Sequence, residues 1–572
     1  MEDYDVIVIG GGINGLTTGA YLAKAGLKTL ILEARGECGA HCDTTEAGMP
    51  GFYHNLHATW LISACSPAMG DLELTKFGCE HRTTDFIYGK TFEDGKCCLM
   101  GNHPMETKQN WAKLNQKDSE IFLKGGTAAF KNLPRAMNTI HDFLFSAPTE
   151  EKRNTMREFM DTTFAAMGID LTFDKMWPMN GFDVTNAMFE SEHIKTTIES
   201  LAWIGALPPI HPNVGSMGAS FLGMTVGPIL PVHTCKGGSH TLTHSLVKAA
   251  TAYGARILTT CPVEKILIEN GEAKGVVLGK EAIYSGETIR AKKIVSNLTL
   301  VPTMMRLVGE EHLGARVSTI KKFDYDEQNL IGVYYALDGA PQWKSAEFDE
   351  GIQRCFMGYF GGNTSKDLKA FNSDLVNKVI HDKICANWFI PSLADPTQAP
   401  DGCHTSFVWL DTPPQPKKWK HGPLNGLSSW NDIKDRLADE ITDTYEKYAP
   451  GFKKLIKDRI IYTPLDMQFN NPSAICGNWV GGSMIPEQFW FKRPLENIMV
   501  NGSSRTFIKN LYMSNSTHPF GATFLASGYI AADELATDMG ARNQPWWKDK
   551  ACRWLFENMS DIPRNLGVPK KK

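Results

Sequence analysis

The chain has 572 residues, 42% of them hydrophobic, and its acidic and basic side chains nearly balance at a net charge of -4. This length predicts a large core and more than one structural unit. The balanced charge argues against nucleic acid as a partner. No basic, cleavable leader is visible at the start of the chain, so we expect a cytoplasmic protein.

The thirteen cysteines are scattered and odd in number, which favours reduced thiols over a disulfide framework. Cys38 and Cys42 flank His41, and Cys97 adjoins Cys98. Neither group has a matching second half at zinc-like spacing. The sequence therefore predicts no metal site.

The first predicted elements form a nucleotide-binding unit. Residues 5–9 are apolar and β-branched, and residues 10–15 read Gly-Gly-Gly-Ile-Asn-Gly. A helical pattern runs from this turn to Ala25, and a second apolar run at residues 29–32 ends in Glu33. Strand, glycine turn, helix, strand and acid in this order predict a dinucleotide site.

Each position in this unit has a physical purpose. Gly10 permits the tight turn, Gly12 lets the backbone approach a pyrophosphate, and Gly15 lets helix and strand pack closely. The helix N-terminus offers unpaired N–H groups to phosphate. Glu33 is placed to accept hydrogen bonds from the adenosine ribose.

Further elements follow from apolar periodicity. The predicted helices cover residues 118–133, 151–168, 241–253 and 432–448, and the predicted strands include residues 330–337 and 460–462. Residues 201–235 contain no Asp, Glu, Lys or Arg, but their prolines would interrupt a membrane helix. We expect an apolar cavity wall there, with peripheral membrane contact as the alternative.

Three separated stretches carry a family resemblance. Residues 34–44 resemble the second flavin-contacting loop of FAD oxidoreductases related to amine oxidases and phytoene desaturases. Residues 236–297 resemble the segment that adds strands to the nucleotide domain, and residues 510–522 resemble the C-terminal flavin motif of carotenoid desaturases. Within this group, residues 45–52 look like the branch of pyridine nucleotide-disulphide oxidoreductase domain-containing proteins.

This resemblance implies an α/β fold in which a Rossmann-like FAD-binding domain is built from three separated segments and carries an inserted mixed α+β substrate domain. The implied boundaries are 1–69, 235–305 and 495–541 for the FAD-binding domain, 70–234 and 306–494 for the substrate domain, and 542–572 for a C-terminal tail. Tryptophans in that tail, at positions 546, 547 and 554, are expected to pack over the core.

The resemblance also implies the cofactor, FAD, and the residues that hold it. They are Gly10, Gly12, Ile13, Asn14, Gly15, Glu33, Ala34, Arg35, Gly39, Ala40, His41, Val263, Asn297, Ser514, Thr517, Pro519, Gly521, Ala522 and Thr523. Two motifs depart from the pattern. His41 stands where many relatives have an arginine that compensates the pyrophosphate, and Ser514, Asn515 and Phe520 occupy places where glycines are common.

The implied reaction transfers a hydride between an apolar, isoprenoid- or terpene-like substrate and flavin N5, as a dehydrogenase or desaturase does. Methionines and aromatics at 176–179, 203 and 221–224 are expected mostly in the core, with some lining the pocket. Histidine exchanges protons near neutral pH. The catalytic candidates are His518, which is favoured, His57 and His240, with His41 beside them.

Several alternatives stay open. The same geometry supports a saturase or an isomerase, a limonene-type monoterpene dehydrogenase subunit with a partner chain, or a non-catalytic prenyl-binding escort protein. No second glycine motif for NAD(P) is visible, so we expect a quinone, oxygen or protein electron acceptor. The sequence leaves a homo-oligomer and a hetero-oligomer open.

Overall fold

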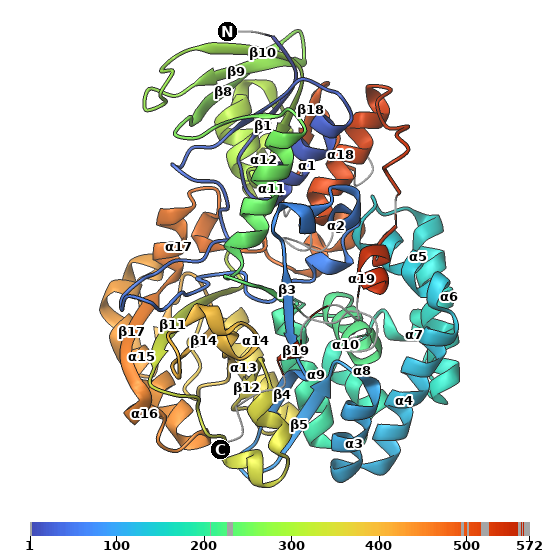
Figure 1. Cartoon of the computed structure of the whole chain (residues 1–572), viewed down its shortest axis with the longest axis vertical. Coiled ribbons are helices and arrows are strands. Elements are labelled where there is room, and N and C mark those ends of the chain that lie inside the picture. The colour runs from blue at the N-terminus through green and yellow to red at the C-terminus, as the bar shows by residue number, and fades with distance from the viewer. Residues whose placement is uncertain are drawn as a thin grey trace.

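The computed structural model describes residues 3–205, 207–225, 233–493, 497–499, 503–515, 525–548, 550–558, 562 and 564–565. One sheet with its helices forms the upper end in Figure 1, and a second sheet lies below it. An arc of helices, coloured cyan, flanks the second sheet.

The upper sheet has a parallel core in the order β7-β2-β1-β10-β18. Its strands are β1 (Tyr4–Ile9), β2 (Thr29–Leu32), β7 (Arg256–Leu258), β10 (Thr288–Ser296) and β18 (Leu511–Met513). β8 (Val263–Glu269) and β9 (Glu272–Leu278) extend it in antiparallel fashion. Three separated parts of the chain therefore build one sheet, which confirms the expected fold class.

The parallel strands are apolar on both faces, as a sheet covered by helices requires. Val6, Ile7 and Val8 are all fully buried. One face is covered by the helices α1 (Ile13–Lys24), α11 (His240–Ala252) and α18 (Ala526–Asp538), and the other packs against β8, β9 and residues 302–309. α1 and α18 meet closely, since Gly528 N donates to Asn14 Oδ1 over 3.0 Å.

The second sheet has the order β17-β11-β14-β13-β12-β4-β5. Its strands are β4 (Phe86–Thr91), β5 (Cys97–Gly101), β11 (Asn329–Leu337), β12 (Met357–Phe360), β13 (Ala386–Phe389), β14 (His404–Thr412) and β17 (Ile456–Tyr462). The helical arc consists of α3 (Pro104–Leu114), α4 (Gln116–Lys131), α5 (Leu133–Leu144), α6 (Glu150–Met167), α7 (Phe173–Met176), α8 (Gly181–Met188), α9 (Glu192–Ile204) and α10 (Val214–Thr225). The remaining helices are α2 (Pro67–Asp71), α12 (Arg316–Lys321), α13 (Ser365–Val376), α14 (Pro391–Ala394), α15 (Trp430–Tyr448), α16 (Phe452–Leu455), α17 (Pro464–Asn470) and α19 (Arg553–Asn558).

A small sheet joins distant parts of the chain. β3 (His81–Thr84) pairs antiparallel with β6 (Thr234–Cys235) and parallel with β19 (Arg564–Asn565). β3 precedes the helical arc in the chain and β6 follows it, so this sheet joins the two ends of the arc. A two-stranded ladder of β15 (Lys418–Trp419) and β16 (Gly422–Pro423) completes the strands described.

Most predicted elements are confirmed. The predicted helices correspond to α4, α6, α11 and α15, and the predicted strands to β11 and β17, which is longer than expected. All thirteen cysteines are free thiols. The tail packs over the core as expected, since the ring centroids of Trp547 and Tyr21 are 4.7 Å apart. No helix within the described ranges is long and apolar enough to cross a membrane.

Candidate active site

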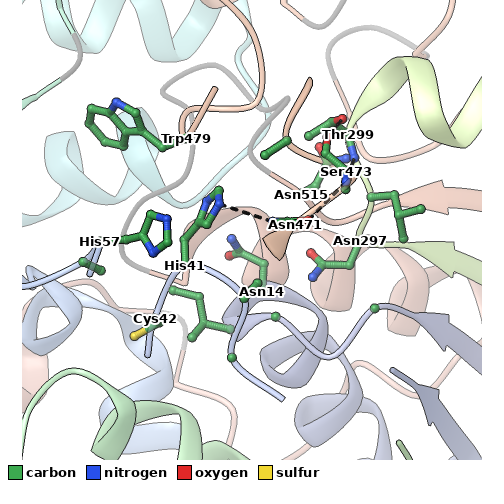
Figure 2. A pocket seen from close by; sticks show the side chains of 18 of the residues that line it. Asn14, His41, Cys42, His57, Asn297, Thr299, Asn471, Ser473, Trp479 and Asn515 are labelled. Atoms are coloured by element: carbon green, nitrogen blue, oxygen red, sulfur yellow. Dashed lines mark hydrogen bonds between the residues drawn. The ribbon is translucent and has the colours of Figure 1, made fainter. Parts of the chain in front are cut away.

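A cavity of about 580 Å³ lies between the two sheets and the helical arc. It is lined by residues from all three parts of the upper sheet, represented by Asn14, Asn297 and Asn515. Figure 2 shows these three side chains on one side and His41, His57 and Trp479 on the other. One space therefore connects the glycine turn to the second sheet and the helical arc.

The glycine turn leaves no room for larger side chains. Gly10 has φ +99°, a conformation that favours glycine. A Cβ on Gly12 would lie 2.9 Å from Asn297 Nδ2, and one on Gly15 would lie 2.1 Å from Gly10 O. The turn thus keeps its backbone open to the cavity and its helix tight against the sheet.

Glu33, at the end of β2, is fixed by backbone donors. Gly11 N donates to Glu33 Oε2 over 2.7 Å, and Arg35 N donates to Glu33 Oε1 over 2.8 Å. Both carboxylate oxygens keep further acceptor capacity, because an ionised carboxylate offers about four lone-pair positions. The carboxylate is therefore oriented before any ligand binds.

Two histidines meet at the middle of the cavity. The rings of His41 and His57 lie with centroids 4.3 Å apart. Asn471 Nδ2 donates to His41 Nε2 over 3.4 Å, the dashed contact in Figure 2. Both ring nitrogens of His57 are buried without a hydrogen-bond partner among the described residues. His57 is therefore a lining residue whose buried ring is not committed to any of these neighbours by a hydrogen bond.

The loop that carries His57 is fixed by a buried asparagine. Asn55 Nδ2 donates to Gln398 Oε1 over 3.0 Å and to Thr59 Oγ1 over 3.1 Å. Ser239 N donates to Asn55 Oδ1 over 3.0 Å. These bonds join the loop to two distant parts of the chain and hold the histidine in place.

Burial keeps both histidines neutral. It lowers the pKa of His41 to about 4, with the positive charge of Arg35 adding to the effect. The pKa of His57 also lies well below 6.5 because of burial, followed by His41 and then Arg35. A neutral imidazole keeps one ring nitrogen as an acceptor for a proton or a hydrogen bond.

Seven large apolar side chains line part of the cavity. They come from the helical arc, the second sheet and α17, and they are Phe143, Leu144, Ile204, Leu207, Leu330, Trp409 and Met467. Ile204 and Leu207 confirm that the uncharged segment forms part of a cavity wall. Such a chamber favours a substrate with a hydrocarbon surface.

Most predicted cofactor residues converge here. Those that line the cavity are Gly10, Gly12, Ile13, Asn14, Glu33, Ala34, Arg35, Gly39, Ala40, His41, Val263 and Asn297. Gly15 packs beneath the turn, and Ser514 Oγ lies 3.5 Å from Asn297 Oδ1. Thr517, Pro519, Gly521, Ala522, Thr523 and the catalytic candidate His518 lie outside the described residues.

His240 takes a different position. Its Nε2 lies 3.2 Å from Cys38 O and 3.4 Å from Glu37 Oε1, and it is not among the residues that line the cavity. Met176 and Trp203 are also buried outside the cavity lining, as core side chains.

The sequence missed a second group of lining residues. They are Trp60, Arg306, Asn470, Asn471, Pro472, Ser473, Ala474, Asn478 and Trp479. Thr299 N donates to Ser473 Oγ over 2.8 Å, which anchors the segment after α17 to the loop after β10. A chain separation of 174 residues hides this contact from sequence patterns.

The upper sheet and its glycine turn have the arrangement of a Rossmann-like dinucleotide-binding domain, and the cavity begins at this turn. Residues 8–72 match the family model of the NAD(P)-binding Rossmann-like domain. An oxidoreductase from Methanosarcina mazei has a similar fold, with a TM-score of 0.57 at 14% identity, covering 93% of this chain and 99% of that one. Cyclohexylamine oxidase from Brevibacterium oxydans gives a TM-score of 0.52 at 14% identity, covering 94% and 100%.

Relatives of known name are similar to the chain over most of its length. One of the limonene dehydrogenase subunits of Castellaniella defragrans is 26% identical, covering 96% of this chain and 97% of that protein. Pyridine nucleotide-disulfide oxidoreductase domain-containing protein 2 of Rattus norvegicus is 28% identical, covering 94% of each. The lycopene-forming phytoene desaturase of Pseudescherichia vulneris is 22% identical, covering 90% and 94%.

Proposed function

We propose that the chain is an FAD-dependent dehydrogenase or desaturase that transfers a hydride from an apolar, isoprenoid- or terpene-like substrate to flavin N5. The observation that carries this proposal is the single cavity that joins the glycine turn to an apolar chamber. Hydride transfer needs cofactor and substrate in one water-poor space at contact distance.

The residues present fit FAD. Gly12 keeps a backbone approach open, and Glu33 is oriented for a ribose. Val263 also lines the cavity, where it would contact the adenine. Asn297, which follows β10, lines the cavity beside the glycine turn. Bound FAD would supply the hydride acceptor, and the chain supplies orientation and exclusion of water.

Two arginines replace the charge that His41 lacks. Arg35 and Arg306 are the cationic side chains among the residues that line the cavity. Arg35 also pairs with Asp43, its Nη2 lying 3.7 Å from the Asp43 carboxylate. We propose that Arg35 and Arg306 together compensate the charge of the pyrophosphate. Of the two, only Arg35 forms the ion pair with Asp43.

His57 is the described side chain best suited to proton transfer. Its neutral ring and uncommitted nitrogens let it accept the proton that leaves the carbon next to the hydride donor. His41 and the anchored loop hold it in position. His518 remains the candidate that the sequence alone favours.

Substrate and partners follow from the relatives. The names limonene dehydrogenase and phytoene desaturase support a terpene or isoprenoid substrate. The first of these relatives is named as one subunit of its enzyme, which supports a hetero-oligomer. Electrons then pass to a quinone, oxygen or a protein acceptor.

The test is a visible spectrum of the purified protein under anaerobic conditions, before and after addition of a panel of terpenes and isoprenoids. The expected result is a flavin spectrum that one compound bleaches. A colourless protein that does not take up FAD would overturn the cofactor assignment. A flavin spectrum unaffected by the panel would overturn the dehydrogenase direction with these substrates.

A further inference from the structure

A group of metal-ligating side chains lies in the small sheet, outside the candidate active site. Cys79 lies two residues before His81, which begins β3, and Cys235 ends β6. His81 and Cys235 are directly opposite each other in the antiparallel ladder. The two sulfur atoms and one ring nitrogen of His81 all lie within 4.8 Å of one another, and all three residues are buried.

The distance between the sulfur atoms suits a metal. Cys79 Sγ and Cys235 Sγ are 3.8 Å apart. A disulfide would require about 2.05 Å. Two thiolates at about 2.3 Å from a tetrahedral zinc ion lie about 3.8 Å from each other. The thiols are therefore spaced as a pair of zinc ligands.

His81 is held in a manner typical of metal-ligating histidines. Its Nε2 lies 3.1 Å from Ser63 Oγ. In the tautomer that donates Nε2–H to this hydroxyl, Nδ1 carries the free lone pair, and Nδ1 is buried without a partner among the described residues. Ligating histidines commonly donate their second ring nitrogen to such an outer partner.

A second histidine, His233, packs beside His81. His233 is two residues before Cys235, so alternation along the strand places both on one side. The rings of His233 and His81 lie with centroids 5.5 Å apart. Two thiolates would balance the charge of a divalent cation, which makes a buried complex neutral overall.

We propose that Cys79, His81 and Cys235 bind a structural zinc ion, with His233 beside the site. This site is independent of the proposed oxidoreductase function. The sequence hides it because 156 residues separate the two cysteines, so no short zinc-type spacing appears.

The position of the site indicates its role. The ion would fasten the strand that precedes the helical arc to the strand that follows it. The arc contributes Phe143, Leu144 and Ile204 to the apolar chamber. The zinc site therefore stabilises the attachment of the helices that form the wall of this chamber.

The test measures zinc in the full chain, expressed with added zinc and purified without a metal-affinity step. We expect about one zinc ion per chain by mass spectrometry of the elements. Cys79→Ser and Cys235→Ser should lose it. Cys97→Ser is the matched control, because Cys97 is equally buried but lies on β5, outside the cluster, and it should keep the ion.

A second measurement covers variants that fail to fold. Chelation of zinc from the wild-type protein should lower its Tm, and added Zn²⁺ should restore it. Two results would overturn the proposal: wild-type protein that neither contains zinc nor takes up Zn²⁺ or Co²⁺, or a disulfide between Cys79 and Cys235 in peptide mass spectra.

Discussion

The rings of His41 and His57 pack against each other with centroids 4.3 Å apart and planes inclined by 30°. Two imidazolium ions at this distance would repel strongly in a buried site, so at most one ring can be charged. When one ring accepts a proton, its positive charge therefore lowers the pKa of the other ring. This coupling suits a site that takes up one proton in each turnover.

The first prediction concerns His57→Gln. If His57 accepts the substrate proton, anaerobic flavin reduction by the substrate should slow by about 100-fold or more, with flavin content unchanged. His54→Gln is the control, since His54 is also buried and has a pKa lowered by burial to about 4, but it does not line the cavity. Equal rates in wild type and His57→Gln would exclude this role.

The same assignment predicts a pH dependence. Because the pKa of His57 lies well below 6.5, the ring should remain a base on acidification. The rate of flavin reduction should stay flat from about pH 8 to pH 6 and fall only in more acidic buffer. A decline centred near pH 6.5, absent in His57→Gln, would show an ordinary exposed histidine instead.

The second prediction tests the glycine turn through Gly12→Ala. The added Cβ would crowd Asn297 Nδ2 at 2.9 Å and occupy the approach to the phosphates. Gly12→Ala should therefore be purified with little bound flavin. Gly36→Ala is the control and should keep the full amount, because no atom lies within 4 Å of the added Cβ. Flavin absorbance per chain measures both, and full occupancy in Gly12→Ala would contradict the proposed cofactor position.

The third prediction concerns Arg306→Gln. Since the Arg306 side chain is exposed at its end of the cavity, the loss of charge should weaken FAD binding only about 3- to 10-fold. Titration of the apoprotein with FAD should show this difference at low salt and a smaller one at high salt. Arg306→Lys should recover part of the affinity, and identical Kd values in all three proteins would leave Arg35 alone as the compensating charge.

The fourth prediction concerns a buried acid in the second sheet. Burial raises the pKa of Asp411 to about 7, although the side chain of Gln328 opposes the shift. The folded state thus binds a proton that the unfolded state releases above about pH 3.8, so this group costs stability as pH rises from about 4 to 7.

Asp411→Asn removes this cost. At pH 8 the variant should gain on the order of 4 kcal/mol, equivalent to a rise of about 3 °C in Tm for a chain of this length. Near pH 4 the two proteins should unfold at similar temperatures. Thermal scans at both pH values decide the matter, and a variant that is less stable at pH 8 would show that the carboxylate is charged and satisfied in the fold.

Local sequence patterns predicted the nucleotide unit because its contacts are local. The turn at Gly10, the helix after it and Glu33 lie within one short stretch, and each has a separate steric or polar requirement. The apolar pattern predicts a strand only at residues 460–462, whereas β17 begins at Ile456. Lys457, Asp458 and Arg459 interrupt the apolar pattern of this strand. Pairing with β11 supplies the hydrogen bonds that make these residues a strand.

The opposite wall of the cavity follows no such local rule. Trp479 and Asn471 occupy loops that read as ordinary turns, and only tertiary contacts bring them to His41. His240 illustrates the reverse case. The sequence places His240 beside a segment that resembles a flavin-contacting one. In the structure, however, its ring lies against Cys38 and Glu37 and does not line the cavity.

The strand order of the upper sheet has a consequence for how the protein is made. β18 pairs with β10, and Asn515 completes the cavity begun at Asn14. At about 5–20 residues per second, the ribosome needs on the order of 25–100 s to add the roughly 500 residues between them. During that interval the nascent chain exposes an unpaired apolar strand edge. The complete cavity therefore forms only after β18 has been synthesised and has paired with β10.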